Sequence, residues 1–220
     1  MCITTSQLGS FTIHRLNLSE IGANCYIVQR GLDAVLIDPT TNSQKISSFL
    51  KSLNLNVMLM IATHGHFDHI SAAQPLIELG FADTLYIHPD DIFELKKART
   101  YMMMVLKQRM QTPHFTEIKS EQVPALEKIG LKVKHVGGHS KGSIVIYSDN
   151  LDFIFSGDMI LHHSLNISAF NKTENKNEYI NFYSWLSKEF KSSSIIFTGH
   201  GDSSTVRNEL DRNPKYATIQ

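Results

Sequence analysis

The chain has 220 residues, of which 42% are hydrophobic and 19% charged, an ordinary composition for a globular protein. Lys plus Arg and Asp plus Glu number 21 each, so the net charge is zero with His neutral. This balance disfavours the basic field with which nucleic-acid-binding proteins attract phosphates. The two cysteines, Cys2 and Cys25, form no spaced disulfide framework.

The sequence also gives an expectation for location and partners. No apolar run is long enough to cross a bilayer, and the first thirty residues lack the pattern of a signal peptide. We therefore expect a cytoplasmic protein with reduced thiols, and neither nucleic acid nor a membrane as a partner.

Short segments rich in β-branched residues recur along the chain and predict strands. The predicted strands are Phe11–Leu16, Asn24–Val28, Ala34–Asp38, Val57–Ala62, Thr84–His88, Lys132–Val136, Ser143–Ser148, Leu151–Ser156 and Ser194–Thr198. Segments with helical spacing lie between them. The predicted helices are Ser43–Leu53, Ser71–Leu79, Asp90–Met110, Asn177–Phe190 and Ser203–Leu210.

The order of these elements predicts the fold class. The first three strands are too close together for crossover helices, so they form a meander, and later strands alternate with helices. Two mixed sheets packed together, with helices on the outer faces, fit this α/β (α+β) order best. We expect a single domain over residues 1–220, with an internal division near residue 115.

Histidines and aspartates gather just after the fourth predicted strand. His64, His66, Asp68 and His69 lie within six residues, where a strand end opens into a loop and helix. A strand end is a rigid place from which to project metal ligands. Two histidines one residue apart can bind the same ion, whereas Asp68 and His69, past the turn, would face a second ion.

Three further candidates follow later strands, each beside glycine: His139, Asp158 and His200. A single His at a strand end is usually structural. Five His and two Asp at four strand ends are poorly explained by packing, so together they predict a metal site.

The run Thr-His-Gly-His-Phe-Asp-His at 63–69 resembles the metallo-β-lactamase superfamily, and within it the glyoxalase II-like thioester hydrolases. Gly-His-Ser-Lys-Gly-Ser at 138–143, Ser-Gly-Asp at 156–158 and Gly-His-Gly-Asp-Ser-Ser-Thr at 199–205 are similar to further motifs of that family. So are Asn-Cys-Tyr-Ile-Val at 24–28 and Val-Leu-Ile-Asp-Pro at 35–39. The resemblance spans nearly the whole chain and implies a four-layer αββα sandwich with metals at one sheet edge.

The resemblance also implies a set of metal ligands. One ion would take His64, His66 and His139, and the other would take Asp68, His69 and His200. Asp158 would bridge the two ions, and Asp68 and Asp158 would be the catalytic carboxylates. The expected cofactors are two divalent ions, zinc first, with iron or manganese as alternatives.

Three departures from the family pattern concern the substrate. The usual Gly-His-Thr-Pro-Gly-Ser has Ser140-Lys141 in its middle here, and the loop after Asp158 lacks the usual Gly-Arg. The helical domain with which full-length glyoxalase II binds glutathione has no counterpart in this sequence. Lys141 and His162 are the candidate substrate contacts, although a solvated loop lysine and a packing histidine are the alternatives. Tyr101 to Leu106, rich in methionine, is either core or an apolar wall over the site.

These ligands favour hydrolysis. A metal with an open position lowers the pKa of bound water toward about 7, and two ions hold a bridging hydroxide ready to attack. A thiolate leaves without a general acid, because its conjugate thiol has a pKa near 8.5. The sequence therefore predicts a hydrolase for a small-molecule thioester or ester, with the oligomeric state left open.

Four alternatives remain. A persulfide dioxygenase with a single iron and a lactonase or other ester hydrolase belong to the same superfamily. A related RNA nuclease is disfavoured by the neutral charge. A binding protein without turnover is disfavoured by the complete ligand set.

Overall fold

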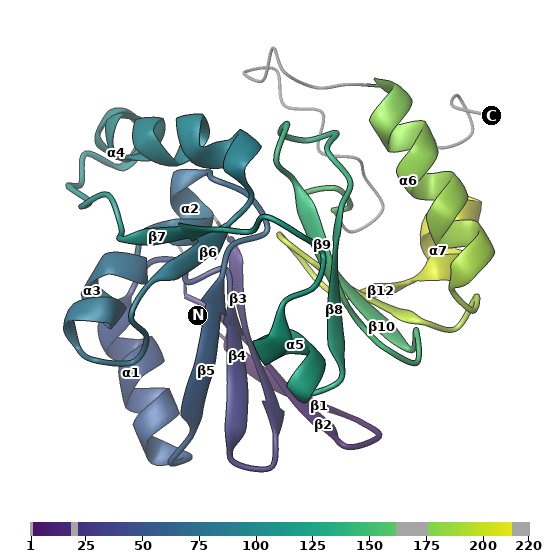
Figure 1. Cartoon of the computed structure of the whole chain (residues 1–220), viewed down its shortest axis with the longest axis horizontal. Coiled ribbons are helices and arrows are strands. Elements are labelled where there is room, and N and C mark those ends of the chain that lie inside the picture. The colour runs from purple at the N-terminus through teal and green to yellow at the C-terminus, as the bar shows by residue number, and fades with distance from the viewer. Residues whose placement is uncertain (1, 19–21, 162–175, 213–220) are drawn as a thin grey trace. The chain divides into compact units, whose positions relative to one another are not determined.

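The computed structural model describes residues 2–18, 22–161 and 176–212. The chain forms two compact units, Met1–Lys119 and Ser120–Gln220. Each unit is built on one β-sheet (Figure 1). The division lies close to the one expected near residue 115, whereas the assignment of the whole chain to a single domain stays a prediction.

The first unit contains a seven-stranded mixed sheet. Its strands are β1 (Cys2–Leu8), β2 (Phe11–Asn17), β3 (Asn24–Arg30), β4 (Asp33–Ile37), β5 (Asn56–Ile61), β6 (Leu85–Ile87) and β7 (Phe115–Glu117), in that spatial order. Strands β1 to β4 form an antiparallel meander, as the short connections predict. Strands β4 to β7 run parallel to one another. Their carboxyl ends therefore meet at one edge of the sheet.

Helices join the parallel strands of this unit. They are α1 (Ser43–Ser52), α2 (Phe67–Ile70), α3 (Ala73–Glu78), the 3-10 turn η1 (Pro89–Asp91) and α4 (Ile92–Leu106). The core includes Ile46 and Leu50 of α1, Leu76 of α3 and Leu95 of α4. Asn42 caps the start of helix α1: its side chain accepts from the Lys45 amide and satisfies a donor of the first turn.

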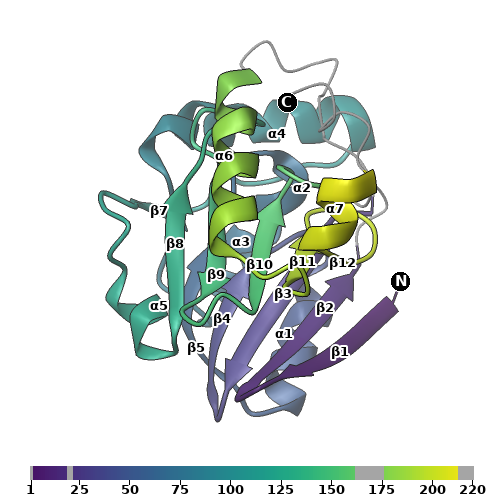
Figure 2. The ribbon, with the colours of Figure 1, turned by 90° about the vertical axis from the view of Figure 1, so that its right-hand side faces the viewer.

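The second unit contains a five-stranded mixed sheet. Its strands are β8 (Leu131–His135), β9 (Ile144–Ser148), β10 (Phe153–Gly157), β11 (Ile195–Thr198) and β12 (Ser204–Thr205), and its helices are α5 (Pro124–Lys128), α6 (Lys176–Glu189) and α7 (Val206–Arg212). The spatial order is β12-β11-β10-β9-β8, and only β10 and β11 are parallel neighbours. Helix α6 lies against this sheet (Figure 2). It buries Tyr179, Phe182, Tyr183 and Leu186 in the core of the unit.

The two mixed sheets with helices confirm the predicted fold class, and each predicted strand and helix has a counterpart. The prediction missed the strands β1, β7 and β12 and the short helices α2 and α5. Strand β1 escaped because most of its residues are exposed, and β7 and β12 have three and two residues. The predicted helix to Met110 ends at Leu106, where Lys107 adopts a left-handed conformation with φ 56°.

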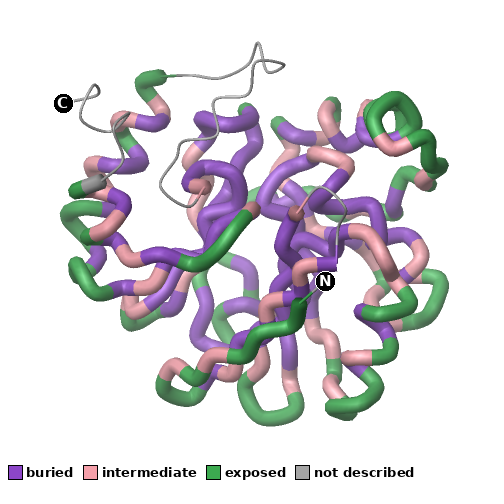
Figure 3. Tube along the Cα trace, turned by 180° about the vertical axis from the view of Figure 1, so that it is seen from behind, coloured by how far each residue is buried: buried purple, intermediate pink, exposed green. Residues whose placement is uncertain are grey.

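In both units the central strands of the sheet contain mostly buried residues (Figure 3). No helix in the described part of the chain is both long and apolar enough to cross a bilayer.

Candidate metal centre

In the first unit, the candidate ligands follow the parallel strand β5. Residues 62–66 leave its carboxyl end, and His66 caps α2, which carries Asp68 and His69. The His64 ring centroid lies 4.6 Å from that of His66 and 4.2 Å from that of His69. His69 Nε2 lies 3.6 Å from Asp68 Oδ2. The structure therefore brings the four ligands of this motif into one cluster, of which only His66 is half-buried.

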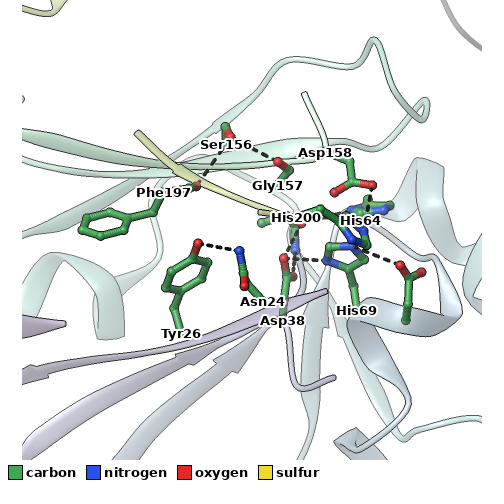
Figure 4. A network of polar contacts seen from close by, with 12 residues as sticks. Asn24, Tyr26, Asp38, His64, His69, Ser156, Gly157, Asp158, Phe197 and His200 are labelled. Carbon is green, nitrogen blue, oxygen red and sulfur yellow. Dashed lines mark hydrogen bonds and ion pairs between the residues drawn. The ribbon is translucent and has the colours of Figure 1, made fainter. Parts of the chain in front are cut away.

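Asp38 fixes the orientation of two of these imidazoles. It directly follows β4, the neighbour of β5, and its carboxylate accepts from the Thr63 amide (2.7 Å) and hydroxyl (2.8 Å). Its Oδ2 also lies 2.9 Å from His69 Nδ1, so this ring nitrogen donates (Figure 4). Because the Thr63 hydroxyl donates to Asp38, it accepts from His64 Nδ1 at 3.0 Å. Both rings then carry the proton on Nδ1 and offer Nε2 as the ligand atom.

Asp91 holds the loop between His64 and His66. Its buried carboxylate accepts from the Gly65 amide at 2.7 Å. A Cβ at Gly65 would lie 2.7 Å from both the Asp91 carbonyl oxygen and the Leu95 amide nitrogen. Glycine at this position therefore lets the ligand loop pack directly on the start of α4.

In the second unit, three candidate ligands follow three strands whose carboxyl ends share one edge. His139 follows β8, Asp158 follows β10 and His200 follows β11. Asp158 Oδ2 lies 3.7 Å from His139 Nε2 and 3.6 Å from His200 Nε2. Asp158 and His139 are buried, and His200 is partly exposed. One carboxylate oxygen therefore faces two imidazoles that come from different strands.

Gly199 makes room for this carboxylate. A Cβ at Gly199 would clash with Asp158 Oδ1 and would lie 2.9 Å from the Gly157 carbonyl carbon. The Gly199 amide donates to the Gly157 carbonyl oxygen at 2.8 Å and ties the ends of β10 and β11 together. The position of Asp158 therefore depends on the absence of a side chain at residue 199.

The loop that leads to His139 is held by α6. Glu178 Oε2 accepts from the Gly138 amide at 2.7 Å, and a Cβ at Gly137 would lie 2.5 Å from the Glu178 carboxylate. Gly137 and Gly138 have φ values of 61° and 92°, which glycine adopts at little cost. The loop therefore takes a path that ordinary residues disfavour and that Glu178 stabilises.

The donor atoms fit a divalent transition metal. Two ligands bound to zinc at tetrahedral geometry lie about 3.3–3.6 Å apart, given bond lengths near 2.0–2.2 Å. The three nitrogen–oxygen separations of 3.6, 3.7 and 3.6 Å agree with this spacing. Imidazole and carboxylate donors suit zinc, iron and manganese alike. Each unit therefore presents a cluster able to ligate a metal, and the division of ligands between two ions stays a prediction.

The remaining polar residues considered in the sequence are not part of the two ligand clusters. The Lys141 side chain is exposed, and its backbone oxygen lies 2.8 Å from His135 Nε2. Its role in substrate binding stays a prediction, and His162 lies outside the described residues. His14, which belongs to no motif, lies 2.9 Å from Thr5 Oγ1 and 3.2 Å from Gln29 Oε1.

Sequence reasoning gave no role to Asp38, Asp91 or Glu178. Asp38 carried a signal, because it ends a predicted strand next to the one that precedes the ligand run. Asp91 and Glu178 act on backbone amides 26 and 40 residues away, and no local pattern marks such a pairing.

Comparison with known proteins identifies the family. The profile described as the metallo-beta-lactamase superfamily matches residues 18–200, which include all seven predicted ligands. The chain belongs to the metallo-β-lactamase superfamily, a class of metallo-hydrolases.

Several relatives align with this chain over most of their own length. Rv2581c of Mycobacterium tuberculosis is 26% identical over 88% of this chain and 92% of that protein. The Bacillus subtilis protein described as "Probable metallo-hydrolase YqgX" is 24% identical over 91% and 95% of the two chains. Hydroxyacylglutathione hydrolase GloC of Haemophilus influenzae is 22% identical over 83% and 86%.

Solved structures share the fold. TTHA1623 in a di-iron-bound form has 25% identity and a TM-score of 0.80 over 91% of this chain and 98% of that chain. ETHE1 from Myxococcus xanthus has 20% identity and a TM-score of 0.70 over 94% and 84%. The similarity to ETHE1 concerns the fold alone. Both solved structures support the metallo-β-lactamase fold for this chain.

Proposed function

We propose that this protein is a binuclear metallohydrolase that cleaves a small thioester. The observation that carries the proposal is the position of Asp158 Oδ2, which lies 3.7 Å from His139 Nε2 and 3.6 Å from His200 Nε2. A carboxylate oxygen between imidazoles from two strands is suited to bridge two ions. We propose that His64, His66 and His139 hold one ion, and that Asp68, His69 and His200 hold the other.

The protein's own groups prepare this site for hydrolysis. Asp38 keeps His69 in the tautomer whose Nε2 is directed to the ligand cluster, and Thr63 does the same for His64. When bound, the ions supply water of lowered pKa and polarise the substrate carbonyl. The carboxylates of Asp68 and Asp158 are the proton acceptors among the ligands, so we assign them the proton of the attacking water.

The leaving group favours a thioester. A thiol has a pKa near 8.5, so a thiolate departs without a dedicated general acid, whereas an amine needs a proton. The proposed ligand set contains only imidazoles and carboxylates, and no further acid is assigned to the leaving group. The similarity to the hydroxyacylglutathione hydrolase GloC supports the same substrate class.

The metal and the location also belong to this proposal. Zinc fits the His and Asp donors, and the di-iron form of TTHA1623 supports iron as the alternative. We propose a small-molecule substrate met in the cytoplasm. A lactone or another ester is the second substrate class, because its hydrolysis uses the same metal ligands.

A substrate panel tests the proposal. The purified protein is assayed on S-D-lactoylglutathione, an acyl lactone and a β-lactam, and for oxygen uptake with glutathione persulfide. Thioester cleavage that Asp158→Asn abolishes and Asp152→Asn retains is the expected result, since Asp152 is a partly exposed residue that pairs with Lys191. Oxygen uptake without hydrolysis would replace the proposal with a dioxygenase, and lactone cleavage alone would replace the thioester.

A further inference from the structure

Helix α4 is apolar on both its buried and its solvent-facing sides. Leu95, Ala98 and Met102 form its buried stripe. Phe93 and Met104 share one side of the helix, because eleven residues correspond to about three turns. Each is two residues, a little over half a turn, from the buried Leu95 or Met102, so this side is opposite the buried stripe. The side chains of Phe93 and Met104 are 64% and 62% exposed. Burial in the core therefore explains one stripe of this helix and leaves the other without a role.

The exposed apolar residues of the molecule are concentrated on this helix. Among the described residues, nine large hydrophobic side chains are exposed, and five of them lie on α4: Phe93, Tyr101, Met103, Met104 and Val105. We call these five the α4 patch. Figure 3 shows the outer part of this helix as exposed. Scattered exposed apolar residues are normal, whereas a contiguous exposed apolar patch marks an interaction surface.

Helix α4 and the residues after it carry an excess of positive charge, although Glu94 in the first turn pairs with Lys97 at 3.6 Å. Between Leu95 and Thr116 the sequence contains five basic residues and no acidic residue, in a chain whose overall net charge is zero. The basic residues are Lys96, Lys97, Arg99, Lys107 and Arg109. Lys97 Nζ lies 3.8 Å from the centre of the Phe93 ring, so a cation and an apolar ring occupy the same surface. Lysine and arginine stems cover apolar area while their charged ends reach outward.

We propose that α4 docks on an anionic lipid surface, with the α4 patch inserted among the headgroups and the surrounding cations paired with lipid phosphates. A helix with apolar and basic side chains on its exposed side binds in the interfacial plane without spanning the bilayer. This proposal departs from the expectation of no membrane partner, which considered only a spanning segment. It is independent of the proposed hydrolase activity.

Vesicle sedimentation tests this surface. The full chain is mixed with phosphatidylcholine vesicles and with vesicles that also contain phosphatidylglycerol, at low and high salt. We expect binding only to the anionic vesicles, and release by salt, because exposed charges are screened. Lys96→Glu with Arg99→Glu should lower the partition coefficient by about tenfold or more. Phe93→Ser with Met104→Ser should lower it about tenfold, through loss of apolar burial.

Matched variants control for unspecific effects. Leu32→Ser with Leu79→Ser changes two equally apolar exposed side chains elsewhere in the same unit, and Lys132→Glu with Lys188→Glu makes the same charge change in the other unit. These controls should bind as the unmodified protein does, and thermal unfolding verifies that each variant is folded. The proposal would be overturned if the protein does not bind vesicles, or if the α4 variants bind them as well as the unmodified protein does. It would also be overturned if the protein binds RNA and not the vesicles.

Discussion

Asp38 and His69 form a buried pair in which the carboxylate oxygen Oδ2 lies 2.9 Å from the ring nitrogen Nδ1. The same oxygen accepts from the Thr63 hydroxyl, which in turn contacts His64 Nδ1. One carboxylate, which is not itself a candidate ligand, therefore sets the tautomers of two candidate ligands. Such partners of ligand histidines usually change metal affinity by about 10–100-fold when they are removed.

We expect Asp38→Asn to weaken metal binding by about 10–100-fold while the protein stays folded. Asn tolerates the φ of 51° at this position, so the backbone is retained. The amide cannot accept from both His69 and Thr63 as the carboxylate does. Competition with a chelator of known affinity measures the change. Asp33→Asn, at the other end of the same strand, should leave affinity unchanged, and equal losses in the two variants would contradict the role of Asp38.

Gly199→Ala should displace Asp158 and remove metal from the second unit's ligands, because the new Cβ would occupy the place of the carboxylate oxygen. Metal analysis of the purified variant measures the loss. Gly31→Ala is the control, since its φ of 66° strains the backbone at a site with open space around the Cβ. That control should lose about 1–2 kcal/mol of unfolding free energy and keep its metal. A Gly199→Ala protein with full metal content would contradict the account.

Glu178→Ala should lower both stability and metal retention, because the Gly138 amide loses its acceptor next to His139. A lost hydrogen bond to a charged acceptor corresponds to about 1.5–3 kcal/mol. Glu178→Gln keeps an acceptor oxygen and should retain most of the metal. Thermal unfolding with and without added zinc separates the two effects. If the Gln and Ala variants behave alike, the amide contact is not what holds the loop.

The two thiols should differ in reactivity. Burial, and secondarily the Asp38 carboxylate, raises the pKa of the Cys25 thiol, whereas Cys2 is exposed. Iodoacetamide should therefore modify one thiol in the native protein and two after denaturation, because the thiolate is the reactive form. Since the folded-state pKa is raised, the stability linked to the neutral thiol is lost as pH rises above the ordinary thiol pKa. Rapid modification of both thiols in the native state would contradict this assignment.

The sequence predicted the central strands of both sheets well, because their β-branched residues are buried and bounded by turns. Strand β1 was missed since it lies at a sheet edge with little burial, and β12 because two residues give no periodicity. The sequence predicted seven candidate ligands from motifs that follow strand ends, and the structure gathers them in one cluster in each unit. Their binding of metal stays a prediction. The contacts of Asp91 and Glu178 were not predicted, because they join backbone amides to side chains far away in sequence.

The metal content of the full chain, purified without chelator, tests the central claim most directly. The account predicts about two ions per chain in the unmodified protein, as a bridged site requires. Asp158→Ala should lower this content to one ion or fewer, and Asp152→Ala should not. A single ion per chain that is unaffected by Asp158→Ala would contradict the assignment of Asp158 as the bridging ligand, and with it the binuclear site.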